Sequence, residues 1–336
     1  MAAALPVMAA YYGRALVDTL HERVGDESLL RGRDDLAPGD RGVNGAWVRA
    51  LAHDGERDGG RQGIYGNAGP SFDYRFQALQ IGLDLYRAID DDRSHRHAGA
   101  YLAYGKGDGD VRHNLLDYDF HAGSDELVAR TVGGYWTGFN ARGAYLDAVG
   151  QYTWYDLRAR STRLPDSFTN GDGVLLSLEA GWPFAPERDR SATDLAGWRL
   201  EPQAQLIWQR VDIDDIVEPV ATVRYRDGDS LVGRIGLRVN QLGEGDSKQG
   251  DPRRRDLWLR ANFWHQFDGT PTTEFSSQAG YVPFAAKLDD TWAELGLGGT
   301  WQVSATGYLY ADLDYTWSFD GDETAWNGKV GMRWNW

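Results

Sequence analysis

The final eleven residues of the chain, WNGKVGMRWNW, alternate between two kinds of position. Trp326, Val330, Met332 and Trp334 fall on one side of an extended backbone, whereas Lys329 and its polar neighbours fall on the other. Successive side chains of a β-strand point to opposite faces, so this pattern predicts a strand with one apolar and one polar face. A chain terminus is usually frayed and polar. An amphipathic terminal strand instead indicates a boundary between an apolar and a polar medium.

The same alternation recurs along the chain and predicts twelve strands. Glycine- and aspartate-rich connections follow strands one, three, five, seven and nine, whereas those after strands four and ten are very short. Many strands exceed the roughly 5–6 residues common in soluble sandwiches, so an antiparallel transmembrane β-barrel is favoured over a sandwich. The predicted strands cover residues 43–54, 71–88, 95–106, 127–141, 143–157, 170–183, 196–211, 229–242, 253–268, 285–302, 304–318 and 323–336.

The strand register predicts which side chains face lipid and which line the pore. The lipid-facing positions are Trp198, Leu206, Trp208, Leu237, Leu313, Trp317 and Trp334. The pore-lining positions are Asp147, Glu179, Arg199, Glu201, Gln203, Gln205, Arg234, Arg238, Arg260, Glu294, Asp312, Asp314 and Arg333. In such a lumen we expect arginine to be tolerated at position 205.

Composition narrows the class of protein further. The chain has 336 residues and a net charge of −15, with 42 glycines, 14 tryptophans, 17 tyrosines and no cysteine. Abundant aromatic residues and glycine suit the girdles and curved strands of a barrel. The acidic balance argues against a nucleic-acid partner, and the lack of cysteine excludes disulfides and thiolate metal sites. No apolar run is long enough for a membrane-spanning helix.

The first 40 residues follow a different period. Residues 6–23 have helical spacing, with Pro6 suited to the first turn and Gly25 to the C-terminus. About 18 residues would span roughly 27 Å, close to the thickness of a bilayer core. A helix with a polar face fits a polar lumen better than lipid; the alternative is a surface helix or tail. The polar face comprises Arg14, Asp18, His21 and Glu22.

We expect this helix to be held in the pore by opposite charges. Arg14 would meet acidic wall residues, namely Glu201, Glu294, Asp312 and Asp314. The two acids of the helix would meet Arg199, Arg234, Arg238 and Arg333. The chain then divides into a linker with a pore-inserted helix, residues 1–40, and a barrel, residues 41–336.

Several segments carry a resemblance to a known family. GWRLEPQAQLIWQRVDIDD, GDSLVGRIGLRVN and the terminal GKVGMRWNW closely resemble the translocator domain of classical monomeric autotransporters. YYGRALVDTLHERVGD and GAWVRALAHDG resemble that family's linker helix and first strand. The resemblance covers almost the whole chain in the family's order.

The resemblance implies a twelve-stranded barrel in the outer membrane of a Gram-negative bacterium, with a helix in its pore. That helix would be the last part of a covalently attached passenger, which the barrel helps to export. The implied partners are outer-membrane lipid, periplasmic chaperones and the barrel assembly machinery. That machinery would recognise Trp334 and Trp336 as the C-terminal assembly signal. Trp336 takes the last position, where phenylalanine is the more usual residue in the family. The implied form is a monomer without cofactor or catalytic activity.

One departure from the family concerns cleavage of the passenger. Some members cut it inside the barrel at an Asn-Asn junction, but no asparagine precedes Asn44 here. We therefore expect the junction to lie upstream of Met1 or this type of cleavage to be absent. Residues 1–6 lack the basic start of a signal peptide and no apolar segment follows, so we expect an exported form to belong to a longer chain.

Other motifs suggest chemistry only weakly. GDSL at 228–231 opens a predicted strand, whereas a catalytic serine needs a strand-to-helix turn and a histidine partner. GKGDGD at 105–110 and DDD at 90–92 are predicted to be polar loops, because no ordered calcium ligands follow. His95 and His97 share a strand face, and His113 and His121 are predicted to lie in a loop. No set of residues shows metal spacing.

Two competing functions remain. A diffusion porin would have a wide channel without a helix ahead of its first strand. A barrel hydrolase would need a histidine cluster near one rim, and His265 has no obvious partner.

Overall fold

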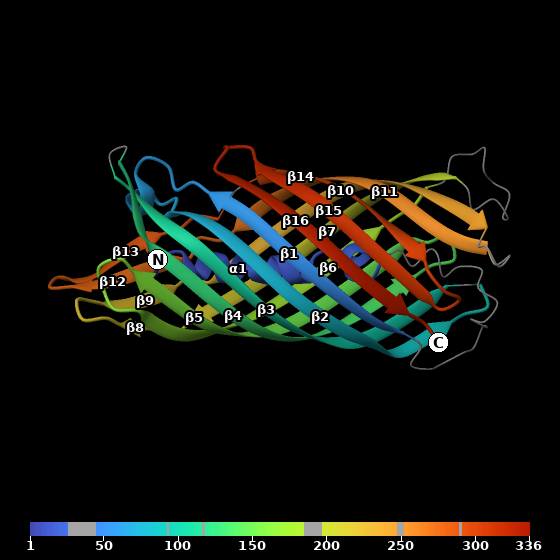
Figure 1. Cartoon of the computed structure of the whole chain (residues 1–336), viewed down its shortest axis with the longest axis horizontal. Coiled ribbons are helices and arrows are strands. Elements are labelled where there is room, and N and C mark those ends of the chain that lie inside the picture. The colour runs from blue at the N-terminus through green and yellow to red at the C-terminus, as the bar shows by residue number, and fades with distance from the viewer. Residues whose placement is uncertain (26–44, 93, 116–117, 185–196, 247–251, 289–290) are drawn as a thin grey trace.

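A closed antiparallel β-barrel forms the body of the protein (Figure 1). The computed structural model describes residues 1–25, 45–92, 94–115, 118–184, 197–246, 252–288 and 291–336. Around the barrel, neighbouring strands follow the order β1-β16-β15-β14-β11-β10-β7-β6-β5-β4-β3-β2. The first and last strands close it, pairing from Ala46 with Trp334 to Arg57 with Glu323. Every strand of the barrel therefore has a partner on both sides.

The twelve barrel strands agree in number and order with the sequence prediction, and most are longer than predicted. Their bounds are β1 (Ala46–Arg57), β2 (Ser71–Ile89), β3 (His95–Leu115), β4 (Tyr118–Phe139), β5 (Tyr145–Ser161), β6 (Ser167–Gly181), β7 (Trp198–Ile213), β10 (Asp229–Asp246), β11 (Pro252–Asp268), β14 (Thr291–Gln302), β15 (Gly307–Ser318) and β16 (Glu323–Trp334).

A second, four-stranded sheet lies at the end of the barrel where the chain begins (Figure 1). The β7–β10 connection supplies β8 (Ile216–Val217) and β9 (Thr222–Arg226), and the β11–β14 connection supplies β12 (Thr272–Ser277) and β13 (Gly280–Ala285). A short helix, η2 (Gly63–Gly66), lies in the β1–β2 connection. The predicted strand 285–302 is therefore wrong at its start, because residue 285 belongs to β13.

The polar connection predicted after the third strand is also wrong. β3 and β4 pair from His95 with Phe139 out to Leu115 with Tyr118, so His113 and His121 lie in strands. GKGDGD at 105–110 lies within β3 and places its glycines on the inner face. A Cβ at Gly105 would overlap the ring of Tyr12. Gly109 likewise faces Met8, so two of the three glycines make room for the N-terminal helix, and the motif serves packing within a strand.

The outer wall carries the side chains predicted to face lipid. Exposed on it are Trp198, Leu206, Leu237, Leu313 and Trp334. Trp208 and Trp317 are half-buried on the same alternating face. These seven side chains therefore lie on the face that the alternation predicted for them.

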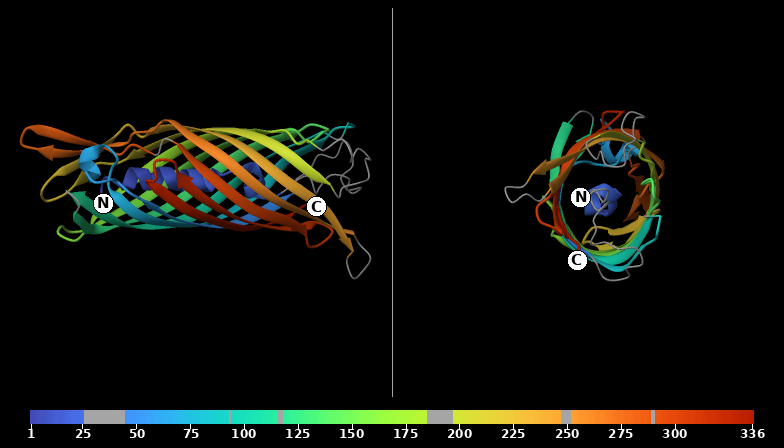
Figure 2. Two further views of the ribbon diagram at one scale, coloured as in Figure 1. Left: turned by 90° about the horizontal axis from the view of Figure 1, so that it is seen from above. Right: turned by 90° about the vertical axis from the view of Figure 1, so that its right-hand side faces the viewer.

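The N-terminal segment runs inside the barrel (Figure 2). It forms two helices, α1 (Leu5–Val17) and α2 (Leu20–Val24), rather than the single predicted helix over residues 6–23. The break lies at Asp18, whose φ of 52° and ψ of −151° belong to a region that suits glycine. Among the described residues, neither helix is both long and apolar enough to cross a membrane.

Candidate functional site: the helix inside the barrel

The interior around α1 is a hydrophobic core. Twelve of the thirteen α1 residues are buried. The ring of Tyr12 lies 5.9 Å from that of Phe76 and 6.2 Å from that of Tyr155, and Tyr11 lies 5.3 Å from Tyr74. The predicted polar lumen is wrong for this half of the barrel, where aromatic side chains point inward.

The residues of β2 show why this core was missed. In the segment around Tyr74 the aromatic side chains point inward, while Asp73 and Arg75 point outward and are exposed. Further along the same strand, Leu79 and Ile81 point outward. The apolar face therefore changes sides within one strand, and a count that assumes one apolar face cannot follow this change.

Side chains of the barrel wall bind backbone groups on both sides of the helix break. Gln151 Nε2 donates to Gly13 O at 3.0 Å, and Arg49 Nη2 donates to Leu16 O at 2.6 Å. Gln205 Nε2 donates to Asp18 O at 2.8 Å. On the far side of the break, the Leu20 N–H donates to Glu179 Oε2 at 2.9 Å. Strands β1, β5, β6 and β7 thus share in holding the break.

Buried charges surround the break and α2. Glu22 lies 2.5 Å from Arg260 and 2.7 Å from Lys329, and it also accepts a hydrogen bond from Thr19 Oγ1 at 2.7 Å. Asp18 pairs with Lys329 as well, and lies 3.7 Å from Arg49. This cluster joins the helical segment to β1, β11 and β16.

The other charged residues of α2 pair with the opposite wall. Arg23 donates from both terminal nitrogens to Asp147, at 3.1 and 2.7 Å. His21 Nε2 shares a hydrogen bond with Glu201 Oε1 at 2.9 Å. A bidentate arginine–carboxylate pair fixes orientation as well as position.

The predicted partner of Arg14 is wrong. Its guanidinium donates to Gln266 Oε1 at 3.1 Å and lies over the rings of Tyr11 and Trp292, 4.8 and 5.0 Å from their centroids. The cause is position along the barrel: Arg14 precedes the helix break, whereas the cluster that holds Asp314 surrounds Asp18 and the helix beyond the break.

The predicted partners of Asp18 and Glu22 are wrong as well, because three of the four predicted arginines pair with carboxylates of the wall. Arg234 lies 3.0 Å from Glu179, Arg238 lies 2.5 Å from Asp256 and Arg333 lies 2.7 Å from Asp84. These three arginines therefore pair along the wall itself. Arg199, the fourth predicted partner, is half-buried near the start of β7.

The structure places the predicted pore-lining residues on the inner side of the barrel. Arg199 and Glu294 are half-buried there. The buried members are Asp147, Glu179, Glu201, Gln203, Gln205, Arg234, Arg238, Arg260, Asp312, Asp314 and Arg333. The sequence-based set omitted Arg49, Lys329, Asp84 and Asp256, which carry central contacts. Lys329 was on the polar face of the terminal strand and could have been included on that ground.

Three buried carboxylates, those of Glu22, Asp312 and Asp314, approach one another closely enough to suggest a metal site. The Nζ atom of Lys329 lies 2.7, 3.4 and 3.2 Å from them, respectively. An ammonium group therefore takes the central position that a metal ion would need. The donor set fits an internal ion-pair cluster better than a metal centre.

The two C-terminal tryptophans lie at the opposite end of the barrel from Met1 (Figure 1). Trp334 ends β16, and Trp336 follows the strand with 61% of its surface exposed. The Asn335 N–H donates to Thr306 O at 2.9 Å, so the backbone between them is attached to the adjacent turn.

A family model described as the autotransporter beta-domain matches residues 46–314. The chain is 26% identical over 328 residues to the adhesin BmaC autotransporter of Brucella suis, covering 95% of this chain and 9% of that protein. It is 31% identical over 164 residues to the probable autotransporter YfaL of Escherichia coli, covering 47% and 12%. The chain thus spans about a tenth of the length of these relatives.

Solved structures show the same architecture. The transport unit of autotransporter AIDA-I from Escherichia coli has a TM-score of 0.71 at 14% identity, covering 98% of this chain and 99% of that one. The translocator domain of NalP from Neisseria meningitidis has a TM-score of 0.63 at 15% identity, covering 97% and 98%. These likenesses confirm the predicted twelve-stranded barrel with an N-terminal helix.

Proposed function

The chain belongs to the autotransporter beta-domain family and is therefore an outer-membrane translocator domain. We propose that its N-terminal helices, α1 and α2, are the end of an exported passenger. The predicted family and outer-membrane location are thus confirmed. The passenger itself, its retention in the pore and the partners of the barrel belong to the proposal. Residues 26–44, which join α2 to β1 across the predicted division at residue 40, lie outside the described residues.

The ends of the barrel suggest its orientation. Outer-membrane barrels have short periplasmic turns and longer extracellular loops. Short turns join Phe139 to Tyr145 and Gln302 to Gly307 at the end that holds the C-terminus, whereas the four-stranded sheet and Met1 lie at the other end (Figure 1). A passenger that precedes Met1 would therefore lie on the cell-surface side.

The contacts of the break and α2 are the observation that carries the proposal. A helix that merely rested in the lumen would not need its free backbone groups and its charges matched by several different strands. Here Gln151, Arg49, Gln205 and Glu179 bind the backbone. The family resemblance and this fit together favour a retained passenger segment over the open channel of a diffusion porin.

We further propose that the domain catalyses no reaction. Ser230 of the GDSL motif lies within β10 and not at a strand-to-helix turn. His265 Nδ1 shares a hydrogen bond with Thr291 Oγ1 at 2.9 Å, which is not the carboxylate partner that a hydrolase histidine needs. Export would then need no cofactor, and a monomer would suffice because one chain closes the barrel. Outer-membrane lipid, the assembly machinery and periplasmic chaperones are the proposed partners.

Display of a reporter on intact cells tests this function. A signal peptide and a protease-cleavable epitope would be placed ahead of Met1, and added protease should remove the epitope from whole cells. Folding of the barrel is checked in parallel by its heat-modifiable migration in gels. A folded barrel whose epitope stays inaccessible until the cells are opened would contradict the proposal.

A further inference from the structure

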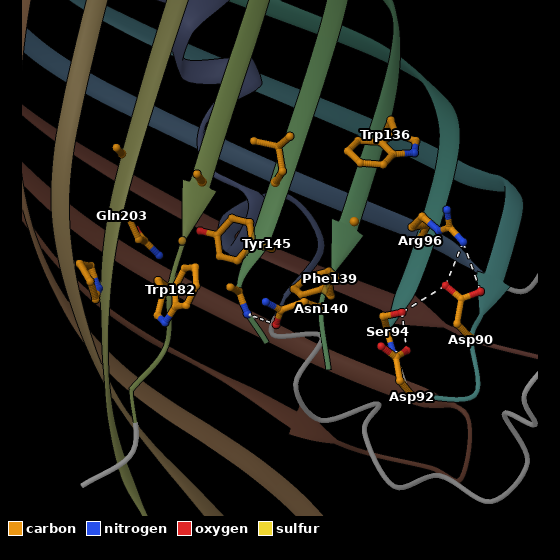
Figure 3. Close-up of a pocket in the computed structure, with 17 residues that line it drawn as sticks. Asp90, Asp92, Ser94, Arg96, Trp136, Phe139, Asn140, Tyr145, Trp182 and Gln203 are labelled. Carbon is orange, nitrogen blue, oxygen red and sulfur yellow. Dashed lines mark hydrogen bonds and ion pairs between the residues drawn. The ribbon is translucent and has the colours of Figure 1, made fainter. Parts of the chain in front are cut away.

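A hollow of about 830 Å³ lies near the periplasmic rim, over the ends of β4, β5, β6 and β7 (Figure 3). Its lining residues on the outer face are of two sizes. Gly138, Ala180 and Ala204 are small, whereas Trp136 and Trp182 are large and exposed. The hollow arises because small side chains on the outer wall are bordered by large ones.

One edge of the hollow carries ionic groups from β3 and the turn before it. Arg96 Nη2 donates to both carboxylate oxygens of Asp90, at 2.9 and 3.2 Å. Ser94 Oγ donates to Asp92 Oδ1 at 2.6 Å, and the Ser94 N–H donates to the same oxygen at 2.9 Å. These bonds from Ser94 lower the pKa of Asp92, so its carboxylate is charged. Figure 3 shows Arg96, Asp90 and Asp92 grouped at one side of the hollow, with Arg96 the nearest of the three to Trp136.

Among the described residues that line it, the hollow therefore joins an aromatic and aliphatic wall to an edge that carries Arg96, Asp90 and Asp92. Aromatic side chains at such a rim lie at the level of lipid headgroups. With the C-terminal end facing the periplasm, as proposed above, the lipid at this height belongs to the inner leaflet. We propose that this hollow binds one glycerophospholipid whose headgroup carries a phosphate and a primary ammonium group.

Charge complementarity selects that headgroup. The guanidinium of Arg96 is half-exposed, and Asp90 engages it through Nη2, which leaves donors suited to a phosphate oxygen. The carboxylates of Asp90 and Asp92 would accept hydrogen bonds from the ammonium group. A phosphatidylglycerol headgroup lacks this cation, and a choline headgroup has no N–H to donate. An acyl chain would lie along Leu146, which is exposed on the outer wall.

Native mass spectrometry of the intact chain released from detergent micelles tests the headgroup. Phosphatidylethanolamine, phosphatidylglycerol and phosphatidylcholine with identical acyl chains would be added in turn. We expect one retained phosphatidylethanolamine, and Arg96→Gln should weaken its retention about threefold to tenfold, the loss of one partly exposed charge-assisted hydrogen bond. The matched control is Arg75→Gln, because Arg75 is an exposed arginine paired with Asp54 at 2.8 Å elsewhere on the outer wall.

A second pair of variants tests whether the lipid needs the empty space of the hollow. Ala204→Trp would fill the hollow and should abolish the preference for phosphatidylethanolamine. Ala148→Trp places the same side chain on the outer wall of β5 outside the hollow and should preserve the preference. Equal retention of all three lipids, or a preference that survives both Arg96→Gln and Ala204→Trp, would overturn the proposal. Since the assay needs neither export nor orientation, its failure would leave the translocator function standing.

Discussion

Glu22 lies fully buried between two cations, 2.5 Å from Arg260 and 2.7 Å from Lys329. Both cations also contact Asp314 of the wall, at 2.8 and 3.2 Å. Charges removed from water are stable only when opposite charges and hydrogen bonds replace the solvent. At the scale of single residues, this shared cluster is what couples the position of α2 to the fold of the barrel.

Substituting Glu22→Gln tests this coupling. The change keeps the shape of the side chain but leaves two buried cations without one carboxylate, so the free energy of unfolding should fall by about 3–5 kcal/mol. The measurement is denaturant unfolding in detergent micelles. The control Glu126→Gln removes a half-exposed carboxylate 2.7 Å from Arg160 and should cost about 0–1 kcal/mol. Similar losses in both variants would show that Glu22 is not central.

The sequence predicted which side chains point into the barrel better than it predicted which of them form ion pairs with one another. Asp314 and Arg260 were recognised because alternation alone places them inside. Whether they contact Glu22 depends on the stagger between neighbouring strands and on the position of the helix break. Neither can be predicted from the alternation pattern within one strand. Arg49 was missed because the inner face of β1 also carries Trp47 and Leu51, so no polar face stands out.

The prediction that arginine is tolerated at position 205 is also revised. Gln205 Nε2 donates to Asp18 O at 2.8 Å and to Ser177 Oγ at 3.0 Å, and its Oε1 accepts from Arg234 at 2.9 Å. An arginine there would lose these bonds and set a second cation beside Arg234. The lumen at this level is a packed interior, so we expect Gln205→Arg to impair folding.

At the scale of elements, β2 (Ser71–Ile89) passes through two environments. On β2 the outer face carries Leu79 and Ile81 in one part and Asp73 and Arg75 in another, where the inner face is aromatic. The first part matches a lipid-facing wall, and the second matches a wall that faces water around a dry interior. The second strand was nevertheless predicted at almost its full length, whereas the strands predicted at 95–106 and 127–141 were too short, since β3 continues to Leu115 and β4 begins at Tyr118.

Two leucines on the outer face of β15 test the depth of the lipid-facing wall. Leu313 lies near the middle of the strand, and Leu309 lies two residues from its start at Gly307. Arginine at the bilayer midplane costs roughly 2–4 kcal/mol, against roughly 0–1 near the interface. We therefore expect Leu313→Arg to lower the free energy of unfolding in lipid vesicles far more than Leu309→Arg. The reverse order would mean that the lipid boundary is misplaced along β15.

At the scale of the whole molecule, one chain closes the barrel by pairing its first and last strands. The pairing of Ala46 with Trp334 brings the N-terminal end of β1 to the C-terminal end of β16. The fold class could be predicted because twelve amphipathic strands allow few closed arrangements in a membrane. The four-stranded sheet could not, because its strands are as short as the two residues of β8 and carry little alternation.

Removal of Trp336 separates assembly from folding at this scale. The residue follows β16 and is largely exposed, so it contributes little packing to the barrel wall. If the assembly machinery reads it, its deletion should slow membrane insertion in cells and affect refolding into detergent much less. Insertion kinetics in pulse-labelled cells and refolding yields in vitro give the two readouts. Equal impairment in both would make Trp336 a packing residue.

The central claim is that α1 and α2 close the pore of this barrel. A helix with its side chains is about 10–12 Å across, and nearly all residues of α1 and α2 are buried inside the barrel. Arg14→Glu alone should change little in the cluster, because Arg14 contacts Gln266 and aromatic rings instead of the buried acids. Removal of residues 1–24 deletes both helices while every barrel strand keeps its two partners.

Planar-bilayer conductance of the intact chain and the chain lacking residues 1–24, recorded side by side, tests this claim most directly. We predict that the truncated barrel still inserts but that its single-channel conductance is several-fold higher, because the lumen is then open to ions. Thermal unfolding should confirm that the truncated barrel is folded and less stable, since the helix contacts are lost. Identical conductance of the two folded proteins would place the helix outside the conducting path and contradict the account.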